Sequence, residues 1–520
     1  MRYFRLFWTF IVGVNALVLP LDSNESGKVG KSIRSGLGRL RHFSSGFKDD
    51  YSSKPMVDSE ELQKAITKQE LNSSVWDLWD ASNASVATIG HRTRVIGSPG
   101  HIGTLDFILK ELSKLEDYYN VSVQHFTAFS GNIKSANLTF SNGTDIEDSL
   151  PMTFSPSVEG FTGKLVQVPN AGCENSDYSN LNLSSESIAL LERGACSFIA
   201  KSNLAGSHGF KAMVVYDNVE AAEPFRGSLN DQGNNTVPGF GVTRTLGHIL
   251  LSEISNDPDF SLFFSMDSTL EITNTTNIIA DTKHGDPNNI VSLGAHSDSV
   301  LAGAGINDDG SGTISLLTVA KHLRNYQVKN KVRFAWWSAE EEGLIGSNYY
   351  VSQLTPEENQ KIRLFMDYDM MASPNYEYQV YDANNSANPV GSEELKNLYI
   401  DYYVSHDLPY VLIPFDGRSD YVGFIENGIP GGGVTTGAEM LNAKNGIAYD
   451  VCYHQLCDDT NNLAWDAFMV NTRLIAHSVA TYAKSLDGFP EIQQDSTVIS
   501  SFHSSNKAPL FQYRGSQLVY

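Results

Sequence analysis

The sequence predicts an α/β protein with a mixed, mostly parallel central sheet flanked by helices, and with a β-rich insertion. Between residues 277 and 484, apolar runs of strand length alternate with helical patterns. Several of these runs end in histidine or acidic side chains, which is where sheets of this class place polar sites. Residues 142–264 instead show short β-rich runs between turns, which predicts a separate inserted domain.

Composition agrees with a large globular protein. The chain has 520 residues, of which 41% are hydrophobic and 19% are charged, so it can form two or three domains. Its formal net charge of −23 argues against nucleic acid and anionic membrane surfaces as partners.

The N-terminus is predicted to be a signal peptide over residues 1–20. Arg2 and Arg5 precede an apolar run, residues 6–14, that is too short to span a bilayer comfortably; an uncleaved anchor is the alternative. No later stretch resembles a membrane span. Residues 21–54 are rich in Ser and Gly and are basic, which predicts a pro-segment or flexible arm. We expect a secretory route that leads to the vacuole or the extracellular space.

Glycosylation signals and cysteines agree with a secretory route. N-glycans are expected because sequons begin at Asn72, Asn83, Asn120, Asn137, Asn142, Asn182 and Asn274. The four cysteines would be oxidised there, and their even number allows two disulfides. Cys452 and Cys457 enclose His454, and we expect them to form a disulfide that pins this short loop. A zinc–thiolate site is the alternative.

Apolar spacing divides the rest of the chain into elements. Helical patterns fill residues 59–119, and strand-like alternation starts near Val121. Buried strands are expected at residues 290–295, 332–337 and 364–366, and helices at 313–323, 347–354, 393–403 and 465–482. The last residues, 488–520, form a polar tail without a recognisable role.

Polar side chains follow three of the predicted strands and occupy the loop between the last two cysteines. Together they supply His296, Asp308, Glu341, Asp369 and His454. Two histidines and three carboxylates, one of them bridging, suit a pair of Zn²⁺ ions with open positions for water. The other histidines lack such a context and are interpreted as surface or core residues: His91, His101, His284, His322, His406 and His477.

These motifs resemble, in kind and order, those of the di-zinc aminopeptidases of the bacterial leucyl aminopeptidase and fungal aminopeptidase Y type. The resemblance covers residues 55–127 and 277–487. The matching motifs are HSD at 296–298, GINDDGSG at 305–312, AEEEGLIGS at 339–347, DMMASPN at 369–375, GRSDY at 417–421 and CYHQLCD at 452–458. The family implies a zinc exopeptidase fold.

The resemblance also implies a role for each site residue. One zinc would be held by His296, Asp308 and Asp369, and the other by Asp308, Glu341 and His454. Glu340 matches the general base, and Asp298 matches the acid that orients His296. Tyr453 matches a residue that stabilises the tetrahedral intermediate, and Arg418 and Asp420 match a loop bordering the site. Glu342 departs from the pattern, since some members have an apolar residue there.

The insertion at 142–264 resembles a protease-associated domain, which implies a disulfide between Cys173 and Cys196. The expected function is a metalloaminopeptidase that hydrolyses N-terminal residues from peptides with free N-termini. Water activated by the two zinc ions would give its proton to Glu340. One alternative is a carboxypeptidase of the glutamate-carboxypeptidase type, but no arginine cluster flanks the motifs. The other is a non-catalytic, receptor-like relative, but every ligand position is filled.

Overall fold

The computed structural model describes residues 51–491 except 220–223, 226 and 230–232. The predicted signal peptide (1–20), the predicted pro-segment as far as residue 50 and the tail from residue 492 lie outside the described residues. Among the described helices, none has both the length and the apolar character needed to cross a membrane. We call residues 142–264 the insertion and the other described residues the main body.

A mixed sheet forms the centre of the main body, as predicted. Strands β8, β9, β10 and β13 pair parallel with one another, whereas β13 pairs antiparallel with β11, and β7 pairs antiparallel with β9 and with β1. The order across the sheet is β12 (Tyr410–Ile413), β11 (Tyr378–Tyr381), β13 (Gly431–Thr435), β10 (Ile362–Tyr368), β8 (Asp286–His296), β9 (Asn330–Trp337), β7 (Ser261–Thr282) and β1 (Tyr119–Phe140).

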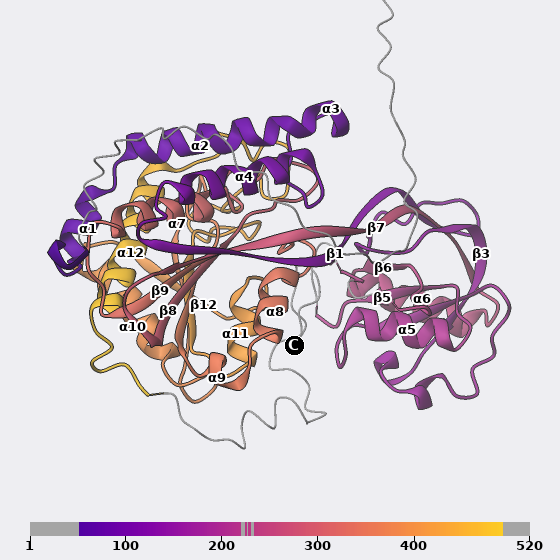
Figure 1. The fold of residues 1–520 in the computed structure, drawn as a ribbon. Helices are drawn as coiled ribbons and strands as arrows, with labels where there is room; N and C mark the ends of the chain where they lie inside the picture. Colours follow the sequence, from indigo (N-terminus) through magenta and orange to yellow (C-terminus); the bar gives the residue numbers. More distant parts are fainter. Residues whose placement is uncertain (1–50, 220–223, 226, 230–232, 492–520) are drawn as a thin grey trace, which may run out of the picture. The chain divides into compact units, whose positions relative to one another are not determined.

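Side chains of the sheet alternate between two layers of helices, because successive residues of a strand face opposite sides. On β9, Phe334 and Trp336 belong to one apolar core, and Ala335 and Trp337 belong to the other. Figure 1 shows α2, α4 and α7 on one side of the sheet and α8 and α11 on the other. The helices of the main body are α1 (Ser59–Ala65), α2 (Lys68–Ser82), α3 (Val86–Ile89), α4 (Pro99–Ser113), α7 (Gly310–Leu323), α8 (Ile345–Ser352), α9 (Pro356–Asn359), α10 (Ser392–Ser405), α11 (Tyr421–Glu426) and α12 (Trp465–Lys484).

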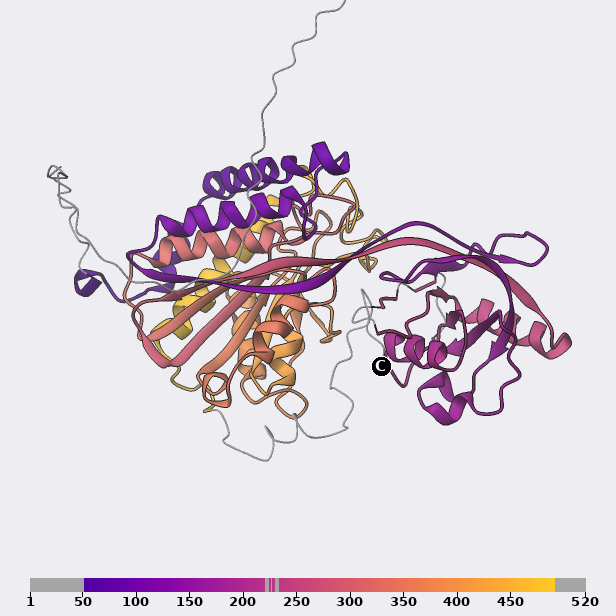
Figure 2. The same ribbon diagram turned by 45° about the vertical axis from the view of Figure 1, so that its right-hand side comes forward.

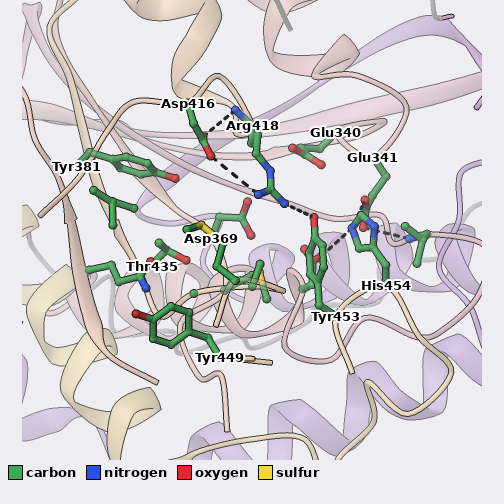
Figure 3. A pocket seen from close by; sticks show the side chains of 18 of the residues that line it. Glu340, Glu341, Asp369, Tyr381, Asp416, Arg418, Thr435, Tyr449, Tyr453 and His454 are labelled. Atoms are coloured by element: carbon green, nitrogen blue, oxygen red, sulfur yellow. Dashed lines mark hydrogen bonds and ion pairs between the residues drawn. The ribbon is translucent and has the colours of Figure 1, made fainter. Parts of the chain in front are cut away.

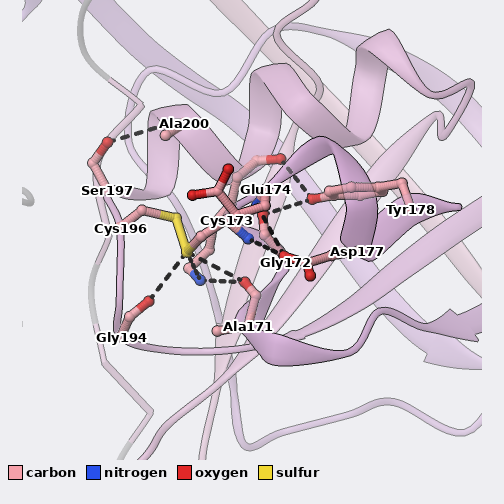
Figure 4. Close-up of a disulfide and its surroundings, with 11 residues drawn as sticks. Ala171, Gly172, Cys173, Glu174, Asp177, Tyr178, Gly194, Cys196, Ser197 and Ala200 are labelled. Carbon is pink, nitrogen blue, oxygen red and sulfur yellow. Dashed lines mark hydrogen bonds between the residues drawn. A yellow bond between two sulfur atoms is a disulfide. The ribbon is translucent and has the colours of Figure 1, made fainter. Parts of the chain in front are cut away.

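The strands of the insertion continue the sheet beyond β7, and the insertion has cores of its own. Parallel pairing joins β3, β4, β5 and β6, and two helices pack beside them. The predicted disulfide between Cys173 and Cys196 is present, with an S–S distance of 2.08 Å (Figure 4). The elements are β2 (Ser149–Pro151), β3 (Val158–Gln167), β4 (Ser187–Glu192), β5 (Ala212–Tyr216), β6 (Gly239–Val242), α5 (Phe198–Ser207) and α6 (Arg244–Asn256).

Two long strands connect the main body with the insertion. β1 and β7 each have 22 residues and pair antiparallel from Tyr119 opposite Thr282 to Phe140 opposite Leu262. β7 also pairs with β9 of the main body and with β3 of the insertion. The sheet of the main body therefore continues into the insertion through β7, and Figure 2 shows β7 as one continuous twisted ribbon with β1.

Candidate metal centre and active site

The predicted metal ligands come together where parallel strands end. His296 is the last residue of β8, Glu341 follows β9 by four residues, and Asp369 directly follows β10. Asp308 lies two residues before α7. Because the carboxyl ends of parallel strands share one edge of the sheet, residues far apart in sequence meet there. His454 joins them from the loop between Cys452 and Cys457 (Figure 3).

The ligand atoms form two groups that share Asp308. His296, Asp308 and Asp369 form the first group, and Asp308, Glu341 and His454 form the second. Within each group the candidate atoms lie within 4.8 Å of one another. The Nε2 atom of His296 lies 3.1 Å from Oδ1 of Asp308, and the Nε2 atom of His454 lies 3.2 Å from Oδ2. Each oxygen of Asp308 thus faces a different histidine, which is how a bridging carboxylate is arranged.

The donors fit a divalent cation. Oδ1 of Asp369 is buried without a hydrogen-bond partner among the described residues, and it lies 3.7 Å from Nε2 of His296. The other oxygen of Asp369 accepts a hydrogen bond of 3.0 Å from Ser419. An unpaired buried carboxylate oxygen is costly, and a cation between it and the imidazole would satisfy both. Imidazole and carboxylate donors are the ligands that zinc accepts in catalytic sites.

The carboxylates hold protons on the histidines of the metal-free chain. Burial lowers the pKa of His454, but Glu341 and Asp308 outweigh this effect and raise the pKa to about 10. Burial likewise opposes protonation of His296, whereas Glu340 and the other surrounding carboxylates raise its pKa well above the ordinary value. A metal ion must therefore displace a proton from each imidazole, which makes binding depend on pH.

Glu340 lies beside the first ligand group without belonging to either group. Its side chain is buried, and its Oε2 atom lies 3.9 Å from Nε2 of His296. Burial raises its pKa well above the ordinary value; His296 opposes this shift and Glu341 adds to it. Cations at the two ligand groups would favour the ionised carboxylate, the form that can accept a proton.

Asp298 makes contacts other than the one expected from the resemblance. Its Oδ1 atom lies 3.8 Å from Nδ1 of His296, which is too long for a hydrogen bond. Its two oxygens instead accept the backbone N–H groups of Glu340 and Glu341, each at 3.3 Å. Asp298 therefore positions the loop that carries these two glutamates, and its predicted orienting role toward His296 stays a prediction.

The predicted disulfide between Cys452 and Cys457 is present, with an S–S distance of 2.09 Å. Both sulfurs are bonded to each other, so the zinc–thiolate alternative is excluded. His454 inside this loop has a φ of 57°, a left-handed conformation that non-glycine residues rarely adopt. The short disulfide loop thus holds a ligand in an otherwise unfavourable backbone conformation.

A cavity of about 320 Å³ opens beside the two ligand groups. Its wall contains five acids, Asp308, Glu340, Glu341, Asp369 and Asp416, together with Arg418 and His454. Figure 3 shows Tyr381, Thr435 and Tyr449 on the side of the cavity away from His454. Tyr453 also lines the cavity, and its ring stacks on the imidazole of His454 with centroids 3.8 Å apart.

Arg94 holds the loop between two ligands, a role that the sequence did not reveal. Its side chain is fully buried and donates hydrogen bonds to the main-chain carbonyls of Ser297, Ala304 and Gly305. No motif identifies such a residue, because every amino acid supplies a carbonyl acceptor. An arginine in a loop gave no signal beyond its charge.

Two further residues support the site from behind. His101 is buried, and its Nε2 atom lies 3.2 Å from the hydroxyls of both Ser297 and Ser338. It therefore connects the loops after β8 and β9. Asp458 accepts the backbone N–H groups of Asn307 and Asp308 at 2.9 and 3.1 Å. Asp458 is the last residue of the CYHQLCD motif, and this position in the motif could have indicated that it supports the site.

Comparisons with known proteins identify both parts of the chain. The model of Peptidase family M28 matches residues 277–479, and the PA domain model matches residues 161–250. Aminopeptidase Y of Saccharomyces cerevisiae is 56% identical over 474 residues, covering 90% of this chain and 88% of that protein. The probable leucine aminopeptidase 2 of Aspergillus oryzae is 41% identical over 456 residues, covering 85% of this chain and 89% of that protein.

Solved structures share the fold. The aminopeptidase from Aneurinibacillus sp. strain AM-1 matches with a TM-score of 0.64 at 23% identity, covering 84% of this chain and 97% of that chain. BSAP, a zinc aminopeptidase from Bacillus subtilis, matches with a TM-score of 0.55 at 24% identity, covering 82% and 98%. The predicted mixed α/β architecture is confirmed.

Proposed function

This chain belongs to peptidase family M28 and is a metalloaminopeptidase with an inserted PA domain, and we propose that it works with two zinc ions. His296, Asp308 and Asp369 would hold one ion, and Asp308, Glu341 and His454 would hold the other. The observation that supports two ions is the placement of the two Asp308 oxygens, each facing a different histidine.

Zinc at these groups would supply Lewis-acid activation of the scissile carbonyl and of the attacking water. Glu340 is free of both ligand groups and lies at the cavity wall, so it can take the proton of the water. It then gives this proton to the leaving amine. Asp298 holds the backbone of Glu340 during these transfers. Tyr453 would donate a hydrogen bond to the oxyanion of the tetrahedral intermediate.

The charge of the cavity favours a peptide with a free N-terminus. Five carboxylates line it, whereas Arg418 is its one arginine or lysine among the described residues and is already ion-paired with Glu439. Zinc would neutralise its ligands Asp308, Glu341 and Asp369. Glu340 and Asp416 remain as acids that can attract a protonated α-amine. The carboxypeptidase alternative needs the opposite charge and is not favoured.

We also propose that the chain enters the secretory pathway, reaches the vacuole or the extracellular space, and carries N-glycans. The two disulfides support an oxidising compartment. The sequon asparagines are exposed at positions Asn72, Asn83, Asn120, Asn137, Asn142, Asn182 and Asn274. Treatment with an endoglycosidase should lower the mass of the protein from its native host; an unchanged mass would rule out the glycans.

The substitution Glu340→Gln tests the assignment of the general base. It keeps the shape of the side chain but removes the proton acceptor, so kcat should fall by roughly 10²–10⁴-fold. Zinc content, measured by elemental analysis, should stay at the wild-type level. The matched control Glu341→Gln should lose zinc together with activity. A Glu340→Gln protein that retains its rate, or that loses its metal, would show that the two glutamates are assigned wrongly.

The choice of substrate tests the function itself. Purified protein should hydrolyse an aminoacyl amide and should fail on the N-acetylated form of the same compound. Hydrolysis should stop after chelation and return with zinc. Cleavage of a peptide with a blocked N-terminus from its carboxyl end would support the carboxypeptidase alternative instead.

A further inference from the structure

Tyr453 makes one hydrogen bond through its hydroxyl among the described residues. The donor is Nη2 of Arg418, and the two atoms lie 3.1 Å apart (Figure 3). The tyrosine ring is fixed independently, because it stacks on His454 at an interplanar angle of 23°. The phenolic oxygen thus stands at the cavity wall with an arginine on one side.

The chemistry of this pair fixes the direction of the hydrogen bond. A guanidinium can only donate, whereas a phenol has one hydrogen to donate and lone pairs to accept with. Arg418 must therefore occupy a lone pair of the Tyr453 oxygen. The phenolic hydrogen takes no part in this contact, so it can be donated to another acceptor. An acidic residue in place of Arg418 would have taken that hydrogen.

Arg418 is itself held in place. The same Nη2 atom donates to Oε2 of Glu439 at 3.0 Å, so its two hydrogens are directed to Glu439 and to Tyr453. Asp416 lies 4.0 Å from Nη1 on the other side of the guanidinium. Because the guanidinium is planar, the direction of one N–H group fixes that of the others. The arginine side chain is 18% exposed, so solvent reaches it only in part.

We infer that Arg418 is a positioning residue for Tyr453, which it orients so that the phenolic hydrogen points to the reacting carbonyl oxygen of the substrate. This inference rests on the proposed role of Tyr453. Glu439 completes the arrangement by fixing the guanidinium. Arg418 then acts on the reaction through Tyr453 and not through a contact with the substrate. Binding of the substrate carboxylate by Arg418 is the competing role.

A double-mutant cycle separates the two roles. The variants are Arg418→Ala, Tyr453→Phe and the double variant, assayed for kcat and KM with an aminoacyl p-nitroanilide, which has no carboxylate, and with a dipeptide, which has one. Tyr453→Phe should lower kcat by roughly 10²-fold, as removal of an oxyanion donor does. Arg418→Ala should lower kcat by about tenfold and leave KM within about twofold, as the loss of a charged hydrogen bond that orients a donor would. In the Tyr453→Phe background, Arg418→Ala should change kcat by less than about twofold, because coupled residues are not additive.

Glu439→Gln gives a second, milder variant. It weakens the hold on Arg418 without touching Tyr453, so a loss of kcat smaller than that of Arg418→Ala is expected, and it too should disappear in the Tyr453→Phe background. Arg324→Ala is the control, because this arginine pairs with Asp117 at an exposed position. Its kinetics should equal those of the wild type.

Three results would overturn the inference. Additive losses in the double variant would mean that Arg418 acts independently of Tyr453. A raised KM with unchanged kcat for Arg418→Ala would assign it to substrate binding. Full activity of Tyr453→Phe would show that the Tyr453 hydroxyl has no role for Arg418 to support. Hydrolysis of the aminoacyl substrate by the wild type would still support the proposed aminopeptidase function. If Arg418→Ala loses zinc or fails to fold, the cycle with Glu439→Gln decides by the same criterion.

Discussion

Replacing Arg94 by methionine should destabilise the metal-free protein and weaken zinc binding together. The guanidinium is fully buried and donates to the carbonyls of Ser297, Ala304 and Gly305. All three carbonyls lie on the loop of residues 296–308, which begins and ends with a metal ligand. Loss of these hydrogen bonds should therefore lower the stability of the fold and change the distance between the two ligands.

The magnitude follows from the groups left unpaired. Methionine has a similar length but no donor, so the buried carbonyl oxygens of Ser297 and Ala304 would lose their donor, at roughly 1–3 kcal/mol each, whereas that of Gly305 keeps the N–H of Gly310. The gross loss is on the order of 2–6 kcal/mol, and it is reduced because the guanidinium no longer has to be desolvated. Burial already lowers the pKa of Arg94, which shows that this desolvation is appreciable. We expect a net loss of about 3 kcal/mol, at the lower end of the range seen when one member of a buried charged network is removed.

Tryptophan fluorescence during urea unfolding provides the assay. The insertion at 142–264 contains no tryptophan, whereas Trp336 and Trp337 are buried in β9, so the signal reports the main body. Zinc affinity is measured by competition with a chromophoric chelator and should fall at least tenfold.

Arg333→Met is the matched control for Arg94→Met. This arginine on β9 pairs with Asp281 away from the ligand loop, so its loss should lower stability and leave zinc affinity unchanged. A loss below about 1 kcal/mol for Arg94→Met would refute the estimate of its buried hydrogen bonds. Unchanged zinc affinity would refute the link between Arg94 and the ligands.

Further predictions concern pH, the disulfide loop and metal content. Burial lowers the pKa of His101 from its ordinary value of 6.5 to about 4. Between pH 6.5 and pH 4 the imidazole is therefore protonated in the unfolded state but neutral in the folded state. The free energy of unfolding falls as the pH drops through this range. His101→Gln should remove about 2 kcal/mol of the stability difference between pH 7 and pH 5, measured by urea unfolding. Replacing Cys452 and Cys457 by serine should lower the free energy of unfolding by at most about 2 kcal/mol, because the loop is short. In a zinc titration, the affinity of the group that contains His454 should fall more than that of the group that contains His296. Asp308→Ala should remove both zinc ions and His454→Ala mainly one, as counted by elemental analysis.

The grouping of the proposed metal ligands could be predicted because their pattern is local. His296 and Asp369 stand directly at the ends of apolar runs, and such ends meet at one edge of a parallel sheet. His454 lies between two closely spaced cysteines, which restricts the conformations of its loop. Residue type and position in the strand pattern were therefore sufficient, and the structure brings these side chains together.

Other features had no local pattern. The long pairing of β1 with β7 is held by backbone hydrogen bonds, and residues 129–137 of β1 and 267–274 of β7 contain no buried side chain. Alternation near Val121 indicated the start of β1, but these middle segments give no apolar pattern that predicts the full length of the two strands. The contacts of His101 with two serine hydroxyls are similarly invisible, since they join residues 196 and 237 positions apart.

The buried charges around the site explain why the metal ions and the acids must be considered together. Arg94 is a buried cation on which four buried acids act, Asp298, Asp309, Asp458 and Asp308. Further buried acids of the main body are Glu340, Glu342, Asp367, Asp420 and Asp450. Burial raises the pKa of Asp420 to about 7 and that of Asp458 to about 8, so both carry protons for part of the time near neutral pH in the metal-free chain. Divalent ions at the ligand groups would favour the ionised form of these neighbours as well as of the ligands. Zinc uptake must then release protons from acids that never touch the metal, and the apparent affinity for zinc must rise with pH more steeply than the two histidine ligands alone would require.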